Sequence, residues 1–299
     1  MTKSLVTGGA GFIGSHLVDK LIALGHQVVV IDNESAECNE KFYWNDKADN
    51  HRLDICDYEF TRDLYEDVDY VFHLAAESRL QTAILNPINA VMKNSVGTCT
   101  VLQCAREAKV KKVMYSSTSS AYGMNKFPNY ETDPNDCLNP YSVSKVSGEE
   151  LCKLYTKLYG LKTIIFRYFN VYGDRSPTTG QYAPVIGIFK KQKDNQEPLT
   201  IVGDGLQQRD FVNVLDVANA NIMAMLANLS DECYGEVYNI GSGENISILE
   251  IAQIMSNDYV HIPPREGEAR TTLANIDKAR TTFGWKPKIK VEEWIQNNG

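Results

Sequence analysis

The sequence predicts an α/β fold, a Rossmann-type doubly wound parallel sheet followed by a smaller C-terminal subdomain. Up to residue 173, short β-branched and aliphatic runs alternate with amphipathic segments of helical period. This alternation is typical of parallel strands that are joined by right-handed helical crossovers. The apolar runs are also continuous rather than alternating, which indicates strands that are covered on both faces.

The predicted elements follow one another along the first half of the chain. Strands are predicted at 4–8, 28–32, 70–75, 112–117 and 163–173. The first helix lies in FIGSHLVDKLIALG, where apolar residues from Ile13 to Leu24 share one face and Gly25 suits the C-terminal end. Two longer helices are predicted at about 83–108 and 141–159.

Beyond residue 173 the chain changes character. GDRSPTTGQ is rich in turn residues, PLTIVGDG, RDFVNVLDVANA and EVYNIGSG are predicted to form short strand or strand-to-helix pieces, and 261–285 is predicted to be mostly loop. We therefore expect a first domain over 1–170 and a subdomain over 171–299. RDFVNVLDVANA is expected to return to the first domain, so that part of 209–240 belongs there.

Composition narrows the class of protein. The chain has 299 residues, 43% of them hydrophobic, and a net charge of −8, which argues against nucleic acid as a partner because phosphate binding needs a basic face. The seven cysteines form no zinc-type spacing, so no metal site is expected. No apolar run approaches the roughly 20 residues that cross a bilayer, and no signal peptide is evident. We expect a cytoplasmic protein without membrane contact.

Three glycines lie directly between the first predicted strand and helix. In VTGGAGFIGSH, Gly8, Gly11 and Gly14 have the spacing that lets a backbone approach a pyrophosphate at a helix N-terminus. A glycine triad alone is equally compatible with an ordinary tight turn. Asp32, however, ends the second strand 18 residues after Gly14, where a carboxylate can accept from an adenosine ribose. The pattern predicts a dinucleotide, and the carboxylate favours NAD over NADP.

A tyrosine and a lysine stand one helical turn apart in YSVSK. Tyr141 and Lys145 are at i and i+4, so both side chains project from one helical face. A nearby ammonium and an oxidised nicotinamide both favour the phenolate, which could then act as a general base. The hydroxyl run from Ser116 to Ser120 ends a predicted central strand, where ligands bind in such sheets. An isolated YxxxK would be an exposed tyrosine beside a solvated lysine.

Five motifs occur in a consistent order: TGGAGFIG, YSSTSSAYG, YSVSK, RYFNVYG and RDFVNVLD. Together they resemble the extended short-chain dehydrogenase/reductases, and within them the NAD-dependent sugar-nucleotide epimerase/dehydratase family, of the UDP-hexose 4-epimerase kind. The resemblance runs from Thr7 to about Trp285. It implies a C-terminal substrate-binding subdomain and a UDP-sugar substrate.

The resemblance also implies roles for individual residues. Thr118, Tyr141 and Lys145 match the catalytic group. The cofactor positions are matched by Gly8, Gly11, Phe12, Ile13, Gly14, Asp32, Asn33, Asp54, Ile55, Leu74, Ala75, Ala76, Asn94 and Phe169, together with Tyr141 and Lys145. The substrate positions are matched by Ser78, Thr118, Asn170, Gln181, Tyr182, Arg209, Arg265 and Thr272. Arg209 and Arg265 suit a diphosphate because guanidinium donors match its oxygens, and the less favoured alternative for each is a surface ion pair.

The reaction that the resemblance implies is epimerisation at C4 through a transient 4-keto sugar. A 4,6-dehydratase typically carries Asp-Glu after the catalytic threonine, whereas here Ser119 and Ser120 follow Thr118. HLAAES (73–78) is closer to the dehydratases and keeps dehydration open. An NAD-dependent reductase and a non-catalytic NAD-binding regulator also stay open. A regulator usually lacks the tyrosine or lysine.

The sequence indicates the identity of the sugar and the oligomeric state less sharply than the reaction. In galactose epimerases that exclude N-acetyl groups, a tyrosine lies seven residues after the arginine that Arg265 matches, and this position is Thr272. UDP-glucose/galactose and UDP-N-acetylglucosamine/N-acetylgalactosamine are therefore both expected substrates, and UDP-glucuronate stays open. The helices at 83–108 and 141–159 carry more apolar residues than one sheet face needs, as in relatives that pair there, so we expect a homodimer.

Overall fold

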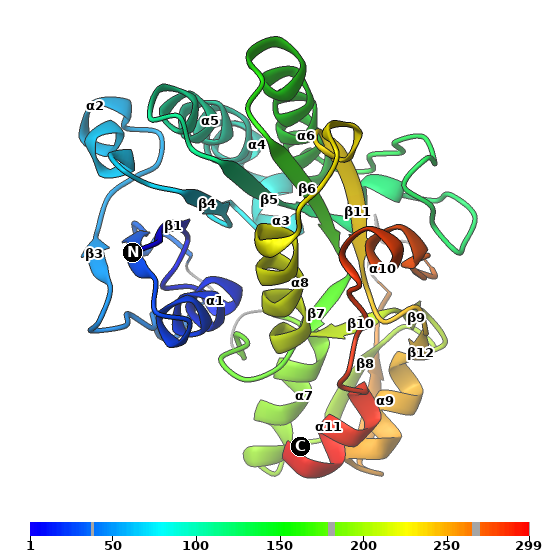
Figure 1. Cartoon of the computed structure of the whole chain (residues 1–299). Helices are drawn as coiled ribbons and strands as arrows, with labels where there is room; N and C mark the ends of the chain where they lie inside the picture. The colour runs from blue at the N-terminus through cyan, green and yellow to red at the C-terminus, as the bar shows by residue number, and fades with distance from the viewer. Residues whose placement is uncertain (37–38, 179–182, 265–269, 299) are drawn as a thin grey trace.

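The computed structural model describes residues 1–36, 39–178, 183–264 and 270–298. Its larger part is a seven-stranded parallel sheet in the order β11-β6-β5-β4-β1-β2-β3 (Figure 1), which confirms the predicted doubly wound fold. The strands are β1 (Lys3–Thr7), β2 (Gln27–Ile31), β3 (Asp49–His51), β4 (Tyr70–His73), β5 (Lys112–Thr118), β6 (Thr163–Tyr168) and β11 (Glu236–Ile240). Strand order reverses between β1 and β4, and open α/β sheets bind ligands outside the carboxyl ends at such a reversal.

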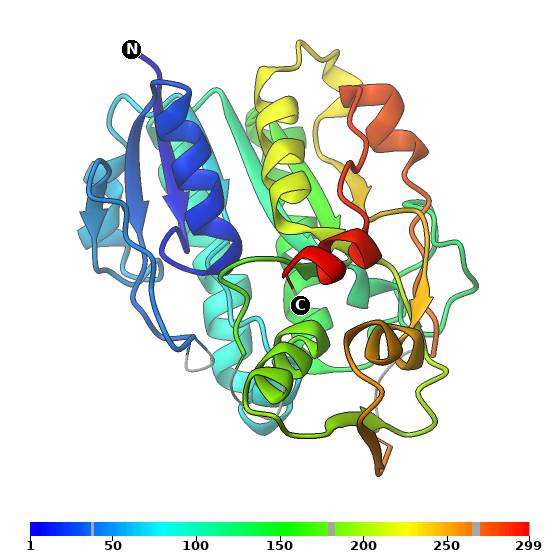
Figure 2. The ribbon, with the colours of Figure 1, turned by 90° about the horizontal axis from the view of Figure 1, so that it is seen from below.

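Helices cover both faces of this sheet. One face carries α1 (Phe12–Ala23), α8 (Val214–Leu226) and α10 (Asp277–Phe283). Figures 1 and 2 show α1, in blue, and α8, in yellow, side by side. The other face carries α2 (Tyr58–Thr61), the short η1 (Arg62–Tyr65), α5 (Gly97–Glu107) and α6 (Pro140–Tyr159). Each face therefore has its own buried core.

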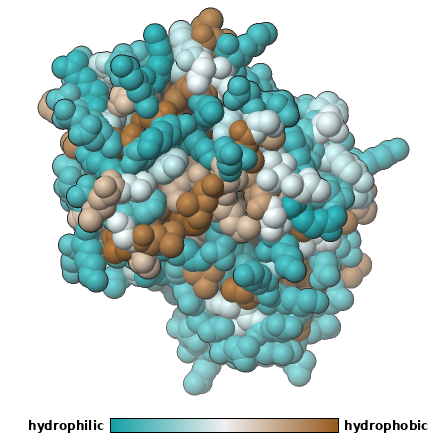
Figure 3. All heavy atoms as spheres, viewed as in Figure 1, coloured by the Kyte–Doolittle hydropathy of each residue, from teal (hydrophilic) through white to brown (hydrophobic). Residues whose placement is uncertain are grey.

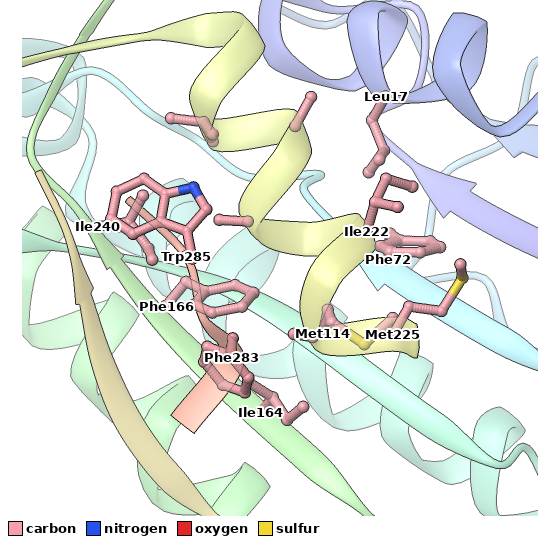
Figure 4. Packing of buried hydrophobic residues seen from close by; sticks show 14 of the residues in the cluster. Leu17, Phe72, Met114, Ile164, Phe166, Ile222, Met225, Ile240, Phe283 and Trp285 are labelled. Carbon is pink, nitrogen blue, oxygen red and sulfur yellow. The ribbon is translucent and has the colours of Figure 1, made fainter. Parts of the chain in front are cut away.

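The core beneath α1 and α8 is the larger of the two. Figure 4 shows Leu17 of α1 against Ile222 of α8, and Trp285 and Phe283 beside Phe166 of β6. Both α8 and the edge strand β11 come from the second half of the chain. The segment 209–240 thus contributes a helix and a strand to the main sheet.

The remaining second-half elements form a smaller unit with its own core. Its strand pairs are β7 (Asn170–Tyr172) with β10 (Phe211–Asn213), β8 (Leu199–Val202) with β13 (Tyr259–Ile262), and β9 (Gln208–Arg209) with β12 (Ile246–Ser247). Its helices are α7 (Val185–Asp194), α9 (Ile248–Met255) and α11 (Val291–Asn298). Phe189, Ile201 and Ile251 are completely buried where these helices meet the strands. A short turn, η4 (Asp231–Cys233), precedes β11.

Three predicted elements differ from the structure. The strand at 163–173 is two strands, because β7 leaves the main sheet to pair with β10. The helix at 83–108 is divided into α3 (Leu80–Leu85), α4 (Pro87–Val91), a π-helical stretch η2 (Met92–Val96) and α5. Pro87 lacks an N–H and keeps Asn86 extended at φ −135°. The stretch 261–285, predicted as mostly loop, contains α10.

Among the described residues, no helix combines the length and apolar character that crossing a membrane requires. Hydrophilic residues cover most of the face shown in Figure 3, and the hydrophobic residues visible on it gather near its middle.

Candidate active site

A cavity of about 550 Å³ lies where the carboxyl ends of the sheet strands face the smaller unit. Its walls come from the loops after β1 and β4 and from β2, β5 and β6 on one side, and from α7, β8 and β10 on the other. This volume is within the range of small-molecule sites. The cavity occupies the place that the strand order predicts.

The glycine-rich turn forms one end of the cavity. Gly8 has φ +69°, and a Cβ added there would lie 2.7 Å from the backbone nitrogen of Ala75. A Cβ on Gly14 would lie 2.1 Å from the carbonyl oxygen of Gly8. Both positions require glycine because the turn folds onto itself and onto the loop after β4. The N-terminus of α1 thereby opens directly into the cavity, as a pyrophosphate site requires.

Two carboxylates line the same end. Asp32 Oδ2 accepts from the backbone N–H of Ala10 at 3.1 Å, and its Oδ1 accepts from the N–H of Glu34 at 2.8 Å. Burial raises the pKa of Asp32, and these hydrogen bonds oppose the rise. The group accepts hydrogen bonds at both oxygens and still has lone pairs for a ribose hydroxyl.

Asp54 is held by two side chains. Asn33 Nδ2 donates to Asp54 Oδ2 at 3.0 Å, and Lys93 from η2 forms an ion pair with the same oxygen. Burial acts to raise the pKa of Asp54, but the hydrogen bonds from Lys93 and from the N–H of Cys56 outweigh it, so the pKa is lowered. Asp54 is therefore a fixed anion beside Ile55 on the same wall.

Tyr141 and Thr118 meet at the middle of the cavity. Asn139 caps α6 through a hydrogen bond from the Ser142 N–H at 2.9 Å, and Pro140 occupies the first helical position. This start sets Tyr141 in the first turn of α6, facing the end of β5. Thr118 is the last residue of β5 and caps the short η3 (Ser119–Tyr122) by accepting from the Ser120 N–H.

The protein's own groups leave Tyr141 with a raised pKa. Burial raises it, and the groups that oppose burial are the Thr118 hydroxyl and Arg79. The sequence predicted that Lys145 and the positive charge of oxidised NAD would together lower this pKa. The protein's own groups do not produce the lowering, so it would require the positive charge of bound NAD.

Lys145 is buried rather than solvated. Its side chain is 2% exposed, and its Nζ lies 4.4 Å from the centre of the Tyr115 ring. Burial lowers the pKa of Lys145 to about 7, although Cys152 and Glu149 act in the opposite direction. The ammonium is thus easily deprotonated unless another group compensates its burial.

This pKa predicts a pH-dependent stability. Between pH 7 and 10.5 the unfolded chain keeps the Lys145 proton and the folded protein loses it, so this group's contribution to stability rises with pH. We expect the free energy of unfolding of the nucleotide-free protein, relative to Lys145→Met, to increase from pH 7 to about pH 10. Urea titrations of both proteins measure the difference. A difference that is constant with pH would contradict the burial of this amine.

The structure brings most of the predicted site residues to the cavity wall. The lining includes Gly8, Gly11, Phe12, Ile13, Gly14, Asp32, Asn33, Asp54, Ile55, Leu74, Ala75, Ala76, Ser78, Thr118, Tyr141, Lys145, Phe169, Asn170 and Arg209. Gln181, Tyr182 and Arg265 lie outside the described residues.

Two predicted residues lie behind the wall instead. Asn94 is completely buried in the π-helical stretch, where its amide bonds both backbone groups of Glu77 and donates to Ser144 Oγ at 2.9 Å. It therefore fixes the loop after β4 against α6. Thr272 Oγ1 accepts from Asn170 Nδ2 at 3.3 Å and from the Asp210 N–H, so it backs a lining residue.

Several lining residues were not predicted from the sequence. Phe42 is one of them, Lys93 pairs with Asp54, and Arg79 lies on the wall within electrostatic range of Tyr141. Arg79 directly follows the HLAAES motif, which indicated only a likeness to dehydratases. A basic residue next to Ser78 was the signal that could have found it.

The chain is similar to known proteins in both sequence and structure. Residues 4–241 match the model of the "NAD dependent epimerase/dehydratase family". A Methanocaldococcus jannaschii protein described as a "Putative UDP-glucose 4-epimerase" is 40% identical, with 98% of each chain covered. The UDP-glucose 4-epimerase of Thermotoga maritima, solved with UDP-glucose, is 35% identical with a TM-score of 0.92, covering 99% of this chain and 96% of that one.

A third relative has a different substrate in its name. The UDP-N-acetylglucosamine 4-epimerase of Methanobrevibacter ruminantium, solved with UDP-N-acetylmuramic acid, is 32% identical with a TM-score of 0.91, covering 99% of this chain and 96% of that one. The glycine turn, the Asp32 wall and the Tyr141–Lys145 helix all lie within the matched residues. This chain therefore belongs to the NAD-dependent epimerase/dehydratase family.

Proposed function

We propose that the protein interconverts the C4 epimers of a UDP-sugar through a transient 4-keto sugar. The observation that carries the proposal is the convergence of Thr118, Tyr141 and Lys145 on one cavity whose other end is the glycine-rich turn. A pyrophosphate cradle and a positioned phenol in one cavity suit hydride chemistry at a sugar carbon. The same cavity continues to Asn170 and Arg209, whose donors suit a diphosphate.

The residues present fit NAD. The backbone at Gly11–Gly14 would hold its pyrophosphate, Asp32 its adenosine ribose, and Lys145 its nicotinamide ribose. Bound NAD would supply the hydride acceptor and donor for the sugar C4.

The chain's own groups handle the proton. Tyr141 accepts the proton of the sugar 4-hydroxyl at its phenol oxygen and later gives it back. The Thr118 hydroxyl lies close enough to the phenol to favour its ionised form. Positioned proton transfer of this kind contributes about 10²- to 10⁴-fold to rate. Residues from both structural units line the cavity that would hold the sugar.

Epimerisation suits the site better than dehydration. Elimination of water across C5 and C6 needs a further acid and base near the sugar. Within the described residues, the carboxylates that line the cavity are Asp32 and Asp54, and both lie at the cofactor end. The positions after Thr118 are Ser119 and Ser120, which also line the cavity.

Incubation with separate sugar nucleotides tests the proposal. Purified protein is incubated with UDP-glucose, UDP-N-acetylglucosamine and UDP-glucuronate in turn, and the products are resolved by proton NMR. We expect inversion at C4 and no net consumption of NAD. A 4-keto-6-deoxy product would identify a dehydratase, and turnover only with added NADH would identify a reductase. Bound NAD without conversion of any sugar nucleotide would indicate a regulator.

The small residue at position 272 supports a substrate with a 2-acetamido group, alongside a 2-hydroxy one. Thr272 supports Asn170 from behind, so a larger side chain there would project toward the cavity. We expect Thr272→Tyr to lower kcat/KM for UDP-N-acetylglucosamine relative to UDP-glucose by about tenfold or more. Thr281→Tyr, at an exposed position of α10, is the control. An unchanged ratio would remove Thr272 from sugar selection.

A homodimer through the helices on one face is part of the proposal. Exposed apolar side chains continue from α3 to η2 and across α6, which packs against α3 and α4. They are Ile84, Leu85, Ile88, Val91, Met92, Val96, Val143, Leu154, Leu158 and Tyr159. Such a concentration of apolar surface favours an interface. Light scattering that gives a monomer mass at micromolar protein would contradict it.

A further inference from the structure

A completely buried ion pair lies directly behind the cavity. The side chains of Arg167 on β6 and Glu149 on α6 are 2% and 0% exposed. Arg167 donates from Nε to Glu149 Oε1 at 2.9 Å and from Nη2 to Oε2 at 2.7 Å. This two-point geometry fixes the orientation of both side chains.

A third residue connects the pair to the catalytic strand. Ser117 Oγ donates to Glu149 Oε1 at 2.5 Å, and Ser117 immediately precedes Thr118 on β5. Glu149 follows Tyr141 and Lys145 at intervals of four residues on α6, so the three side chains share one helical face. The carboxylate of Glu149 is therefore a bridge between the helix that carries Tyr141 and the strand that carries Thr118.

Further contacts make the bridge rigid. The guanidinium carbon of Arg167 lies 4.5 Å from the centre of the Tyr122 ring, and its Nη2 donates to Asn135 Oδ1 at 2.5 Å. A Cβ on Gly148 would lie 2.2 Å from the Tyr115 hydroxyl, so the Tyr115 side chain of β5 packs directly against the backbone of α6. A small displacement of Glu149 must then move the helix relative to the strand.

We propose that Arg167 and Glu149, acting through Ser117, are positioning residues that hold the end of β5, which carries Thr118, in place against the first turns of α6, which carry Tyr141. This inference rests on the proposed epimerase function. Burying two charges is costly, and a well-packed apolar pair is often as stable or more stable. Stability alone therefore does not explain an ion pair at this place, whereas a fixed position of the end of β5 against α6 does.

Ser117→Ala is the mildest substitution that tests the bridge. It removes the link to β5 and leaves the Arg167–Glu149 pair intact. We expect the acid limb of the kcat–pH profile to move upward by roughly 0.5 to 1 pH unit, the equivalent of one hydrogen bond to the phenolate. We expect kcat to fall about tenfold, within the range that misplaced catalytic groups produce, while KM for the sugar nucleotide stays nearly unchanged.

A second variant changes the residue of the bridge that lies on α6. Glu149→Gln keeps the shape of the side chain and removes its charge, and Glu149 is not on the cavity wall. The same shift of the acid limb is expected, together with a lower melting temperature, because Arg167 is left buried without its counter-charge. Glu150→Gln is the matched control. Glu150 is the next residue of α6, and its carboxylate pairs with Lys153 at the surface.

A direct titration separates this inference from the proposed function. The absorbance of NAD-loaded protein at the phenolate band is followed against pH without sugar nucleotide, and subtraction of the Tyr141→Phe curve isolates Tyr141. We expect its midpoint to rise in Ser117→Ala and Glu149→Gln and to stay in place in Glu150→Gln. Unshifted midpoints in both bridge variants would overturn the inference, even where their melting temperatures fall. This readout holds whichever sugar reaction the protein performs.

Discussion

Replacing Tyr141 with phenylalanine should reduce epimerisation by about 10²- to 10⁴-fold, the usual contribution of a positioned acid–base group. The change removes one oxygen from a partly buried side chain, so α6 and the cavity keep their shape. Phenylalanine cannot accept the proton of the sugar 4-hydroxyl, and the hydride step loses its base. NAD should remain bound, because the glycine turn and Asp32 hold the other end of the cofactor.

Stopped-assay NMR on UDP-glucose and UDP-N-acetylglucosamine measures the rate, and absorbance after gel filtration measures retained NAD. Tyr130→Phe, which changes an exposed tyrosine, should keep full activity. Native turnover in Tyr141→Phe would refute the proposed chemistry. Loss of NAD together with activity would instead give Tyr141 a binding role.

Trp285→Ala should have the largest effect on stability, lowering the free energy of unfolding by about 3 to 5 kcal/mol. Trp285 is 1% exposed, and its indole N–H donates to the carbonyl oxygen of Asp216 at 3.0 Å. Figure 4 shows it against α8 beside Phe166 and Ile240. Truncation leaves a cavity and removes this hydrogen bond.

Equilibrium urea unfolding followed by circular dichroism measures this loss. Phe60→Ala is the matched control, because Phe60 is 72% exposed and its truncation should change the free energy of unfolding by less than about 0.5 kcal/mol. Equal effects of the two substitutions would show that Trp285 does not close the core over α8.

The main sheet was predictable because its signals are local. A strand buried on both faces must be apolar at consecutive positions, and β1, β2, β4 and β5 lie near the predicted residues. The first helix was equally clear from its 3.6-residue period. The predictions failed at two places. β7 continues β6 in sequence but pairs with β10 instead of joining the main sheet. Pro87 divides an apolar pattern that is continuous in the sequence into separate helices.

The features of the site also divide into those that the sequence predicts and those that it does not. Gly8, Gly14 and Asp32 were recognisable because a βα turn that cradles a phosphate needs glycine at fixed spacing. The i and i+4 spacing likewise identified Tyr141 and Lys145. The electrostatics were not accessible, because the pKa of Tyr141 depends on burial and on Arg79, 62 positions earlier in the chain.

By itself, then, the sequence determined the parallel α/β sheet, the phosphate-binding turn, and the tyrosine and lysine on one helical face. Each follows from residues within one or two turns of one another, whose geometry the backbone fixes. Only the tertiary structure decided that β7 leaves the main sheet to pair with β10, that Thr272 stands behind Asn170, and that Arg167 and Glu149 tie α6 to β5. Those contacts join residues far apart in the chain, and long-range packing, not local spacing, brings them together.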